Sequence, residues 1–248
     1  AAPLNDGVCL SVAGDGDVLL LGTSTGHIVQ CSWEGGGGSS HDVVSRGDPC
    51  ADGGDHRHGA VIRLDYSTEM RAAAAVMSSG ACALLRIDDG AGIPPGTGTD
   101  DDDDGGGDDG LGFAAVVAER LRLERWVGEG DATCASFSPP SRRTVAVGAS
   151  TGAVRLYRVD AEPDYDVLIA TPWRVLSPAD WGYAPGDTGG CADVCWTSDG
   201  GGVAAGWWRR GVAAWSANGC RLMCTLPQGG GTAGSHADAD AATLRDPR

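Results

Sequence analysis

Residues 187–226 read DTGGCADVCWTSDGGGVAAGWWRRGVAAWSANGCRLMCTL. The stretch contains short apolar runs, separated by turn-forming residues, at 194–196, 203–207, 212–215 and 222–226. This pattern predicts short strands joined by tight polar turns, which form one small antiparallel sheet. A sheet of this size cannot bury both of its faces alone, so it needs copies of itself to pack against.

Weaker copies of the same plan lie upstream, over 131–160, 6–33 and 61–87. Each copy has strand-like runs, and the turn before its last run reads Ser-Thr-Gly or Ser-Ser-Gly, at 150–152, 24–26 and 78–80 respectively. Glycine is favoured in such turns because one central residue usually needs positive φ. Repeats of this kind predict an all-β fold, a WD-type β-propeller that is incomplete and has about four blades.

The segments between the repeats complete the domain plan. We predict propeller blades over 1–34, 60–88 and 111–228, and a disordered tail over 229–248. Two Gly/Asp-rich loop insertions, 35–59 and the acidic 89–110, are predicted to be disordered because they lack periodicity. Residues 113–126, FAAVVAERLRLERW, are predicted to form a short connecting helix, although 114–118 and 121–123 could equally be strand-like.

The acidic insertion has a partial likeness to a calcium-binding loop. Asp100, Asp102, Asp104 and Gly105 match the first half of an EF-hand loop, but Leu111 stands where a bidentate Glu is required. His56 and His58 form an HxH pair in the other insertion, with no fixed acidic or thiol partner nearby. Solvated linkers are therefore favoured over metal sites in both insertions.

Two CxxxC spacings occur, Cys191/Cys195 and Cys220/Cys224. Residues four apart on a strand share a face but lie roughly 13 Å apart, which is too far for one tetrahedral ion. No metal and no cofactor are predicted. Cysteines that fall inside predicted strands are expected to be small buried hydrophobic residues. They are Cys9, Cys31, Cys82, Cys134, Cys195 and Cys224.

The formal net charge of -16 argues against nucleic-acid binding. No apolar run approaches the roughly 20 residues that span a bilayer, and the start of the chain has no signal-peptide pattern. We therefore expect a soluble or peripherally membrane-associated protein. Walker A and HExxH motifs are absent from the sequence, so a non-catalytic protein is predicted.

Trp208, Arg209 and Arg210 are the candidate partner-binding residues. They fall at a predicted strand-to-strand turn, and Trp and Arg are enriched at interface hot spots. Trp207 and Trp215, which lie in the flanking strands, are expected to pack the blade because Trp is mostly buried.

The last repeat also carries a family resemblance. Its motifs are DWGY at 180–183, DTG at 187–189, CWT at 195–197, WS at 215–216 and GCRLM at 219–223. They resemble the N-terminal propeller of the ribosome control protein 1 (Ric-one) family, especially its plant and algal members. The resemblance extends more weakly through the upstream blades and excludes both insertions and the tail. It departs from the family at Ser198-Asp199, where Pro-Asp is usual.

The resemblance implies a role in membrane traffic. Ric-one pairs with Rgp-one in a guanine nucleotide exchange factor for Rab-six (Ypt-six) GTPases, which act in retrograde endosome-to-Golgi and intra-Golgi vesicle transport. The implied partners are an Rgp-one-like subunit and a Rab-six-class GTPase, and the implied location is the cytosol and the peripheral Golgi membrane. The alternative is a generic WD-repeat interaction scaffold of another complex, because a fold alone does not choose its partner.

Overall fold

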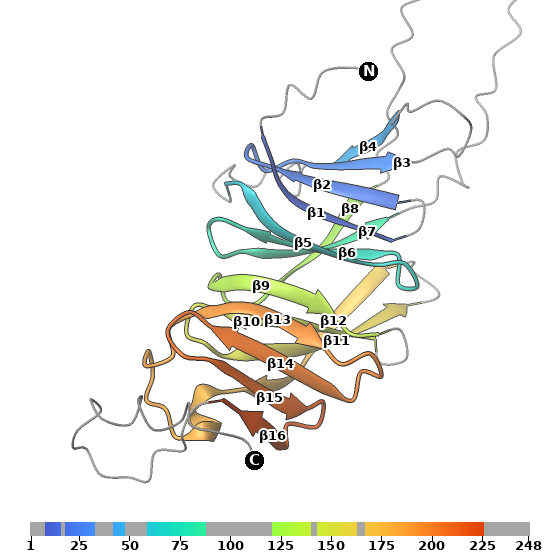
Figure 1. The fold of residues 1–248 in the computed structure, drawn as a ribbon. Helices are drawn as coiled ribbons and strands as arrows, with labels where there is room; N and C mark the ends of the chain where they lie inside the picture. Colours follow the sequence, from blue (N-terminus) through green and yellow to red (C-terminus); the bar gives the residue numbers. More distant parts are fainter. Residues whose placement is uncertain are drawn as a thin grey trace, which may run out of the picture. The chain divides into compact units, whose positions relative to one another are not determined.

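A computed structural model describes residues 8–15, 18–32, 42–47, 59–87, 121–139, 143–162 and 167–225. Within these ranges the fold is built from strands β1 to β16, arranged as 4-stranded antiparallel sheets (Figure 1). Among the same residues, no helix combines the length and apolar character needed to cross a membrane.

Each sheet is a meander in which neighbours in sequence are hydrogen-bonded neighbours in space, and we call the sheets blades 1 to 4. Blade 1 comprises β1 (Cys9–Asp15), β2 (Val18–Thr23), β3 (Ile28–Ser32) and β4 (Asp42–Gly47). Blade 2 comprises β5 (Val61–Ser67), β6 (Ala72–Met77), β7 (Cys82–Ile87) and β8 (Leu121–Val127). Blade 3 comprises β9 (Ala132–Phe137), β10 (Thr144–Ala149), β11 (Val154–Glu162) and β12 (Val167–Leu176). Blade 4 comprises β13 (Cys191–Trp196), β14 (Gly202–Trp207), β15 (Val212–Ser216) and β16 (Arg221–Cys224). The predicted all-β fold with about four blades is confirmed.

The chain divides into two compact units, residues 1–130 with 161–169, and residues 131–160 with 170–248. Small residues fill the second strands of the blades: β6 reads AAAAVM and β10 reads TVAVGA, and every residue of both is buried. Small side chains let two sheets approach closely, which the short strands need in order to bury enough apolar area. Within each unit, neighbouring blades therefore share one apolar core.

Glycines mark the closest approach between blades. A Cβ built on Gly148 of β10 would lie 2.7 Å from Sγ of Cys191, the first residue of β13. A Cβ on Gly22 of β2 would lie 2.6 Å from Cγ1 of Val61, the first residue of β5. Real Cβ atoms essentially never come this close, so each of these positions requires glycine. Gly206 occupies the corresponding place in β14, and nothing lies within 4 Å of a Cβ built there.

The predicted Ser-Thr-Gly and Ser-Ser-Gly turns join the second and third strands of blades 1 to 3. Their glycines have φ of 91°, 88° and 84° at Gly26, Gly80 and Gly152. One backbone hydrogen bond recurs, from the first turn residue to the residue that precedes the blade's first strand. Its pairs are Ser24 N to Val8 O (2.9 Å), Ser78 N to Ala60 O (2.7 Å) and Ser150 N to Asp131 O (2.8 Å).

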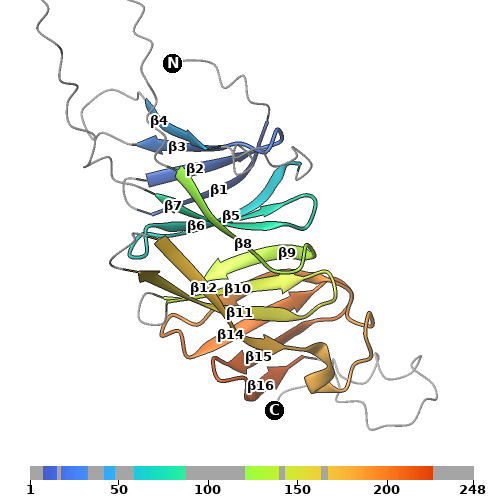
Figure 2. The ribbon, with the colours of Figure 1, turned by 180° about the vertical axis from the view of Figure 1, so that it is seen from behind.

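Two expectations from the sequence are wrong. Residues 42–47, predicted as part of a disordered insertion, form β4 and pair with β3. Residues 121–126, predicted as part of a connecting helix, belong to β8 and pair with β7 (Figure 2). In both places the adjacent strand supplies hydrogen-bond partners that local composition cannot reveal, so pairing overrides propensity. The remaining parts of both insertions, and residues 113–120, lie outside the described residues.

A β-bulge corrects the expectation for the first CxxxC pair. The register of β13 against β14 shifts between Cys191 and Asp193, so two residues of β13 occupy the space of one. Cys191 is buried while Cys195 is exposed, and they do not share a face as a regular strand would require. Cys82 and Cys134 are buried as predicted, whereas Cys9 is exposed.

Gly148 and Gly206 offer a matched pair of substitutions. We expect Gly148→Ala to lower the free energy of unfolding by about 1–3 kcal/mol, because its methyl group overlaps the Cys191 side chain. At a concentration where copies of the chain do not associate, we expect Gly206→Ala to leave it unchanged or to raise it by less than about 1 kcal/mol, because the site is open within one copy and Ala restricts the unfolded chain. Urea unfolding of both variants measures the difference, and equal effects would contradict the close approach at Gly148.

Candidate protein-interaction site

The candidate residues Trp208, Arg209 and Arg210 form the turn between β14 and β15, as predicted. Trp208 N donates to Gly190 O at 3.1 Å, which is the same hydrogen bond that Ser24, Ser78 and Ser150 make in the other blades. Blade 4 therefore keeps the backbone position of the turn. It replaces the small polar residues of the turn with one aromatic and two cationic side chains.

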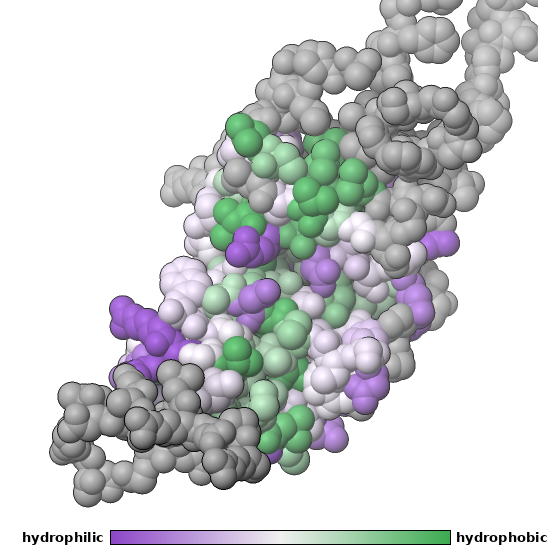
Figure 3. All heavy atoms as spheres, viewed as in Figure 1, coloured by the Kyte–Doolittle hydropathy of each residue, from purple (hydrophilic) through white to green (hydrophobic). Residues whose placement is uncertain are grey.

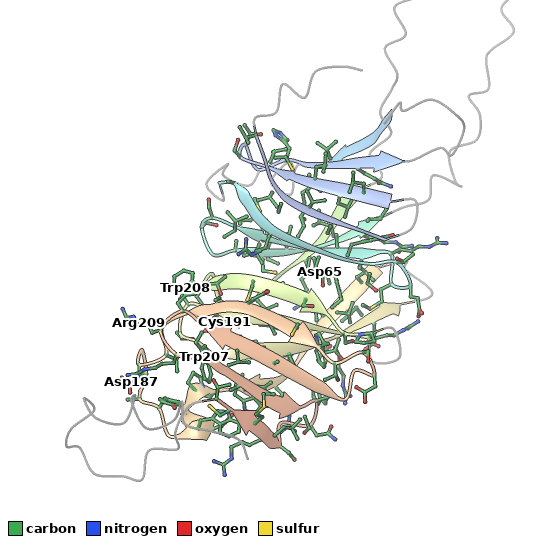
Figure 4. The ribbon with its side chains drawn as sticks, viewed as in Figure 1. Asp65, Asp187, Cys191, Trp207, Trp208 and Arg209 are labelled. Atoms are coloured by element: carbon green, nitrogen blue, oxygen red, sulfur yellow. The ribbon has the colours of Figure 1, made fainter. Side chains whose placement is uncertain are left out.

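The backbone of this turn is held while its side chains face solvent. Arg209 N donates to Thr188 O at 3.1 Å, beside the bond from Trp208. The Trp208 side chain is 72% exposed, and Arg209 and Arg210 are exposed as well. Figure 4 shows Trp208 and Arg209 at the end of β14, and hydrophilic atoms in Figure 3 occupy the place that Figure 4 labels Arg209. An exposed Trp beside two Arg is the composition that interface hot spots favour.

Aromatic rings pack together at the end of β14, next to the turn. Trp207 is buried, and its indole Nε1 donates to Gly152 O in blade 3 at 2.8 Å. Its ring meets those of Trp215 (centroids 6.0 Å apart) and Tyr183 (6.1 Å apart) edge to face. Such pairs stabilise beyond the area they bury. Trp207 and Trp215 thus pack the blade as predicted, and they fix the strand end from which Trp208 projects.

The connector before β13 contributes to this support, a role that the sequence did not predict. It contains a short 3-10 helix, η2 (Pro178–Trp181), whose capping residue Ser177 accepts from Ala179 N. Trp181 packs edge to face on Trp215 at 6.0 Å, and the Arg221 guanidinium lies over the Trp181 ring at 5.6 Å. The Ser-Pro-x-Asp pattern at 177–180 is a helix-start signal that could have predicted this turn.

The turn carries the positive charges of Arg209 and Arg210. Partial burial, and to a smaller extent the nearby Cys224 thiol, raise the pKa of Tyr183, while Arg210 acts in the opposite direction. The Tyr183 phenol is therefore neutral at physiological pH and leaves the two guanidinium groups as the charges of the turn. On a chain with a net charge of -16, this turn presents positive charge to a partner.

A buried thiol pair lies between blades 3 and 4. Cys134 Sγ is 3.6 Å from Cys191 Sγ, and Thr133 Oγ1 donates to the Cys191 carbonyl at 2.6 Å. The hydrogen bond with Cys134, together with burial, raises the pKa of the Cys191 thiol. A reactive cysteine needs a lowered pKa and access to solvent. The arrangement of Cys191 therefore suits packing.

The sequence has potential metal ligands at several places. Among the described residues, no group of three or more His, Cys, Asp or Glu side chains could hold an ion. The His27 ring lies on the blade 1 turn, with Nδ1 3.0 Å from Thr25 Oγ1. The HxH pair at 56 and 58 and the acidic tract at 100–105 lie outside the described residues.

Comparisons with known proteins support the fold. The chain is similar to Saccharomyces cerevisiae Sqt1, with a TM-score of 0.55 and 11% identity over 85% of this chain and 46% of that one. It is similar to the β-propeller domain of Myceliophteria thermophila Cps50 (Swd1), with a TM-score of 0.53 and 13% identity over 85% and 54%. It is also similar to the computationally designed Ika4 protein, with a TM-score of 0.51 and 12% identity over 87% and 95%.

These similarities define a class. At such low identity they show the fold alone, which is that of a β-propeller. It spans about half the length of Sqt1 and of the Swd1 chain. No protein-family model matches the sequence, and no curated protein matches it.

The support beneath the turn is testable at Trp207. We expect Trp207→Phe to lower the free energy of unfolding by about 1–3 kcal/mol more than Trp215→Phe does. Both changes shrink a buried ring, but only the first leaves a carbonyl, that of Gly152, without its donor. In the described part of the chain, the buried Trp215 Nε1 has no hydrogen-bond partner. Thermal or urea unfolding measures both variants, and equal losses would contradict the role of the hydrogen bond.

The thiols predict a labelling pattern. In the folded protein we expect a maleimide to modify the exposed Cys195 and Cys220 first, and Cys134 and Cys191 only after unfolding. Raising the solution to about pH 9 should not bring Cys191 into the fast group, because its pKa is raised. Peptide mass spectrometry reads the sites. Rapid native labelling of Cys191 would contradict the buried pair.

Proposed function

We propose that this chain is a protein-binding β-propeller that contacts its partner through Trp208, Arg209 and Arg210. The observation that carries the proposal is the repeated turn. Three blades fill it with Ser-Thr-Gly or Ser-Ser-Gly, and blade 4 keeps its backbone hydrogen bond while presenting Trp-Arg-Arg to solvent. A rigid frame with one altered loop is the usual way in which repeat folds acquire a partner.

The finer proposal follows the family resemblance. We propose that the propeller is the part of a Ric-one-type subunit that contacts an Rgp-one-like subunit, in an exchange factor for a Rab-six-class GTPase. Its location would be the cytosol and the peripheral Golgi membrane. Exchange requires tighter binding of the nucleotide-free GTPase than of the loaded form, which is a difference in affinity and needs no nucleophile. A surface of the kind at 208–210 is sufficient for such a role.

Charge on the partner is part of the proposal. Arg pairs best with carboxylates in a bidentate geometry, and an exposed Trp face gains most when it is covered by an apolar or cationic group. The turn therefore fits an acidic surface with an apolar centre. Association with such a partner should weaken as salt rises, because charges at the rim of an interface are screened.

The experiment reverses the charge of the turn. We expect the 248-residue chain to co-purify with the Rgp-one-like subunit, and Arg209→Glu/Arg210→Glu to reduce the yield of the complex by about tenfold or more. The matched control is Arg63→Glu/Arg125→Glu, which makes the same change in net charge at two exposed arginines on other strands. The control should retain the wild-type yield.

The possible outcomes separate the two levels of the proposal. Equal yields for the two double variants would refute the site. If the wild-type chain fails to capture the Rgp-one-like subunit or nucleotide-free Rab-six, the exchange-factor role is refuted. The alternative role, a WD-repeat scaffold of another complex, would then be tested with the same pair of variants on the partner that cross-linking identifies.

A further inference from the structure

Within each unit, one blade covers a particular face of the blade before it. We call this the glycine face, because it contains Gly22 in blade 1 and Gly148 in blade 3. The first residue of the next blade, Val61 or Cys191, lies directly on that glycine. The residue paired opposite the glycine on the third strand is Ile28 or Val154, and both are 0% exposed. The same contact is therefore built twice in this chain.

Blade 4 has the same face without its cover. Gly206 is its glycine, and a Cβ built there meets nothing within 4 Å. Val212 pairs with Gly206 as Ile28 and Val154 pair with theirs, yet it is 38% exposed. Asp193 stands where blade 3 has the buried Cys134, and it is exposed. In the part of the chain that the structure describes, nothing covers the glycine face of blade 4, which is shaped for the first strand of a blade.

Blade 1 carries the counterpart that such a face requires. Cys9 opens β1 as Val61 opens β5 and Cys191 opens β13, but Cys9 is exposed while the other two are 0% exposed. Val8 and Val12, on either side of it, are 67% and 59% exposed. Figure 3 shows apolar side chains gathered over β1 and β2. In blades 2 and 4, the equivalent surface of the first strand is buried against the preceding blade.

We propose that the glycine face of blade 4 binds blade 1 of a second copy of this chain, with Cys9 seated on Gly206. The contact continues an interface that the chain already makes twice, between blades 1 and 2 and between blades 3 and 4. Both surfaces stand on one chain, so the contact is head to tail. The chain spans 46% of Sqt1 and 54% of the Swd1 chain, so a pair of copies supplies the length of a full propeller. The proposal does not rest on the exchange-factor role.

The first test blocks the face without touching the core. We expect light scattering to show a dimer of the wild-type chain that dissociates on dilution, and Gly206→Leu to raise its dissociation constant by about tenfold or more. Leu at 206 points into open space within its own copy but would occupy the place of the second copy's Cys9. Unfolding curves check that the variant remains folded. Val212→Glu should have the same effect, because it buries a charge in the contact.

The second test traps the contact covalently. Asp193→Cys places a thiol where blade 3 has Cys134, whose Sγ lies 3.6 Å from the Cys191 thiol of the next blade. In the proposed contact, Cys9 of the second copy stands in the place of Cys191. Oxidised glutathione should then convert the two thiols to a disulfide, with two molecules of reduced glutathione released. We expect a covalent dimer on a non-reducing gel, and its loss in Asp193→Cys/Cys9→Ser.

The outcomes decide the occupant. A dimer that is weakened by Gly206→Leu and trapped through Cys9 supports the proposal. A chain that is monomeric at every concentration and gives no trapped dimer overturns it. A dimer that Gly206→Leu leaves unchanged also overturns it, because the copies then meet elsewhere.

Discussion

The close approach between neighbouring blades is the constraint on which the rest of the structure depends. At Gly22 and Gly148, a side chain from the first strand of the following blade lies where a Cβ would stand. The backbone of one sheet is therefore in contact with a side chain of the next sheet. A hydroxyl then bridges the sheets: Ser11 Oγ donates to the Val61 carbonyl at 3.1 Å, and Thr133 Oγ1 donates to the Cys191 carbonyl at 2.6 Å. This hydrogen bond satisfies a backbone carbonyl at a place where the sheets exclude water. Blades this small, rich in Ala and Val, gain their stability from such contacts more than from any single large side chain.

That contact also explains why the turns repeat. In blades 2 and 4 the segment before the first strand lies against the turn of the preceding blade. In every blade the residue that precedes the first strand accepts the hydrogen bond of the turn between the second and third strands. The turn is thereby held at the same place whatever its side chains are, so Ser24 and Trp208 sit on equivalent backbone. The frame can therefore exchange a polar turn for Trp-Arg-Arg without changing the fold, which is how a common architecture comes to carry a particular surface.

Much of this was predictable from the sequence because the repeat is local. The glycine near the end of the second strand, the Ser-Thr-Gly turn and the alternating third strand identify blades 1 and 3. A Ser-Ser-Gly turn marks blade 2, and the tryptophan-rich version identifies blade 4. The fourth strands of blades 1 and 2 escaped prediction, because β4 lies within a Gly- and Asp-rich segment and β8 alternates Glu and Arg with Leu. Each of these strands is specified by its neighbour's hydrogen bonds. The burial of Cys191 and the exposure of Cys195 depend on a bulge, which period-2 reasoning cannot foresee. The position of Trp208 at a turn was predictable, but its support by Tyr183 and η2 required the fold.

The turn at 208–210 and the glycine face of blade 4 are joined by β14, so the two proposed occupants would lie close together. In blades 1 and 3 the last turn residue is Gly26 or Gly152, and each is buried against the next blade's lead-in, at Gly59 or Gly189. Blade 4 has Arg210 at that place, and Arg210 is exposed. A blade seated on Gly206 would bring its own lead-in against Arg210 and restrict the side chain that a partner would use. Restriction of this kind can favour the partner by ordering Arg210 in advance, or oppose it by occupying the guanidinium. In either case the two binding free energies are linked, and by the same amount in both directions.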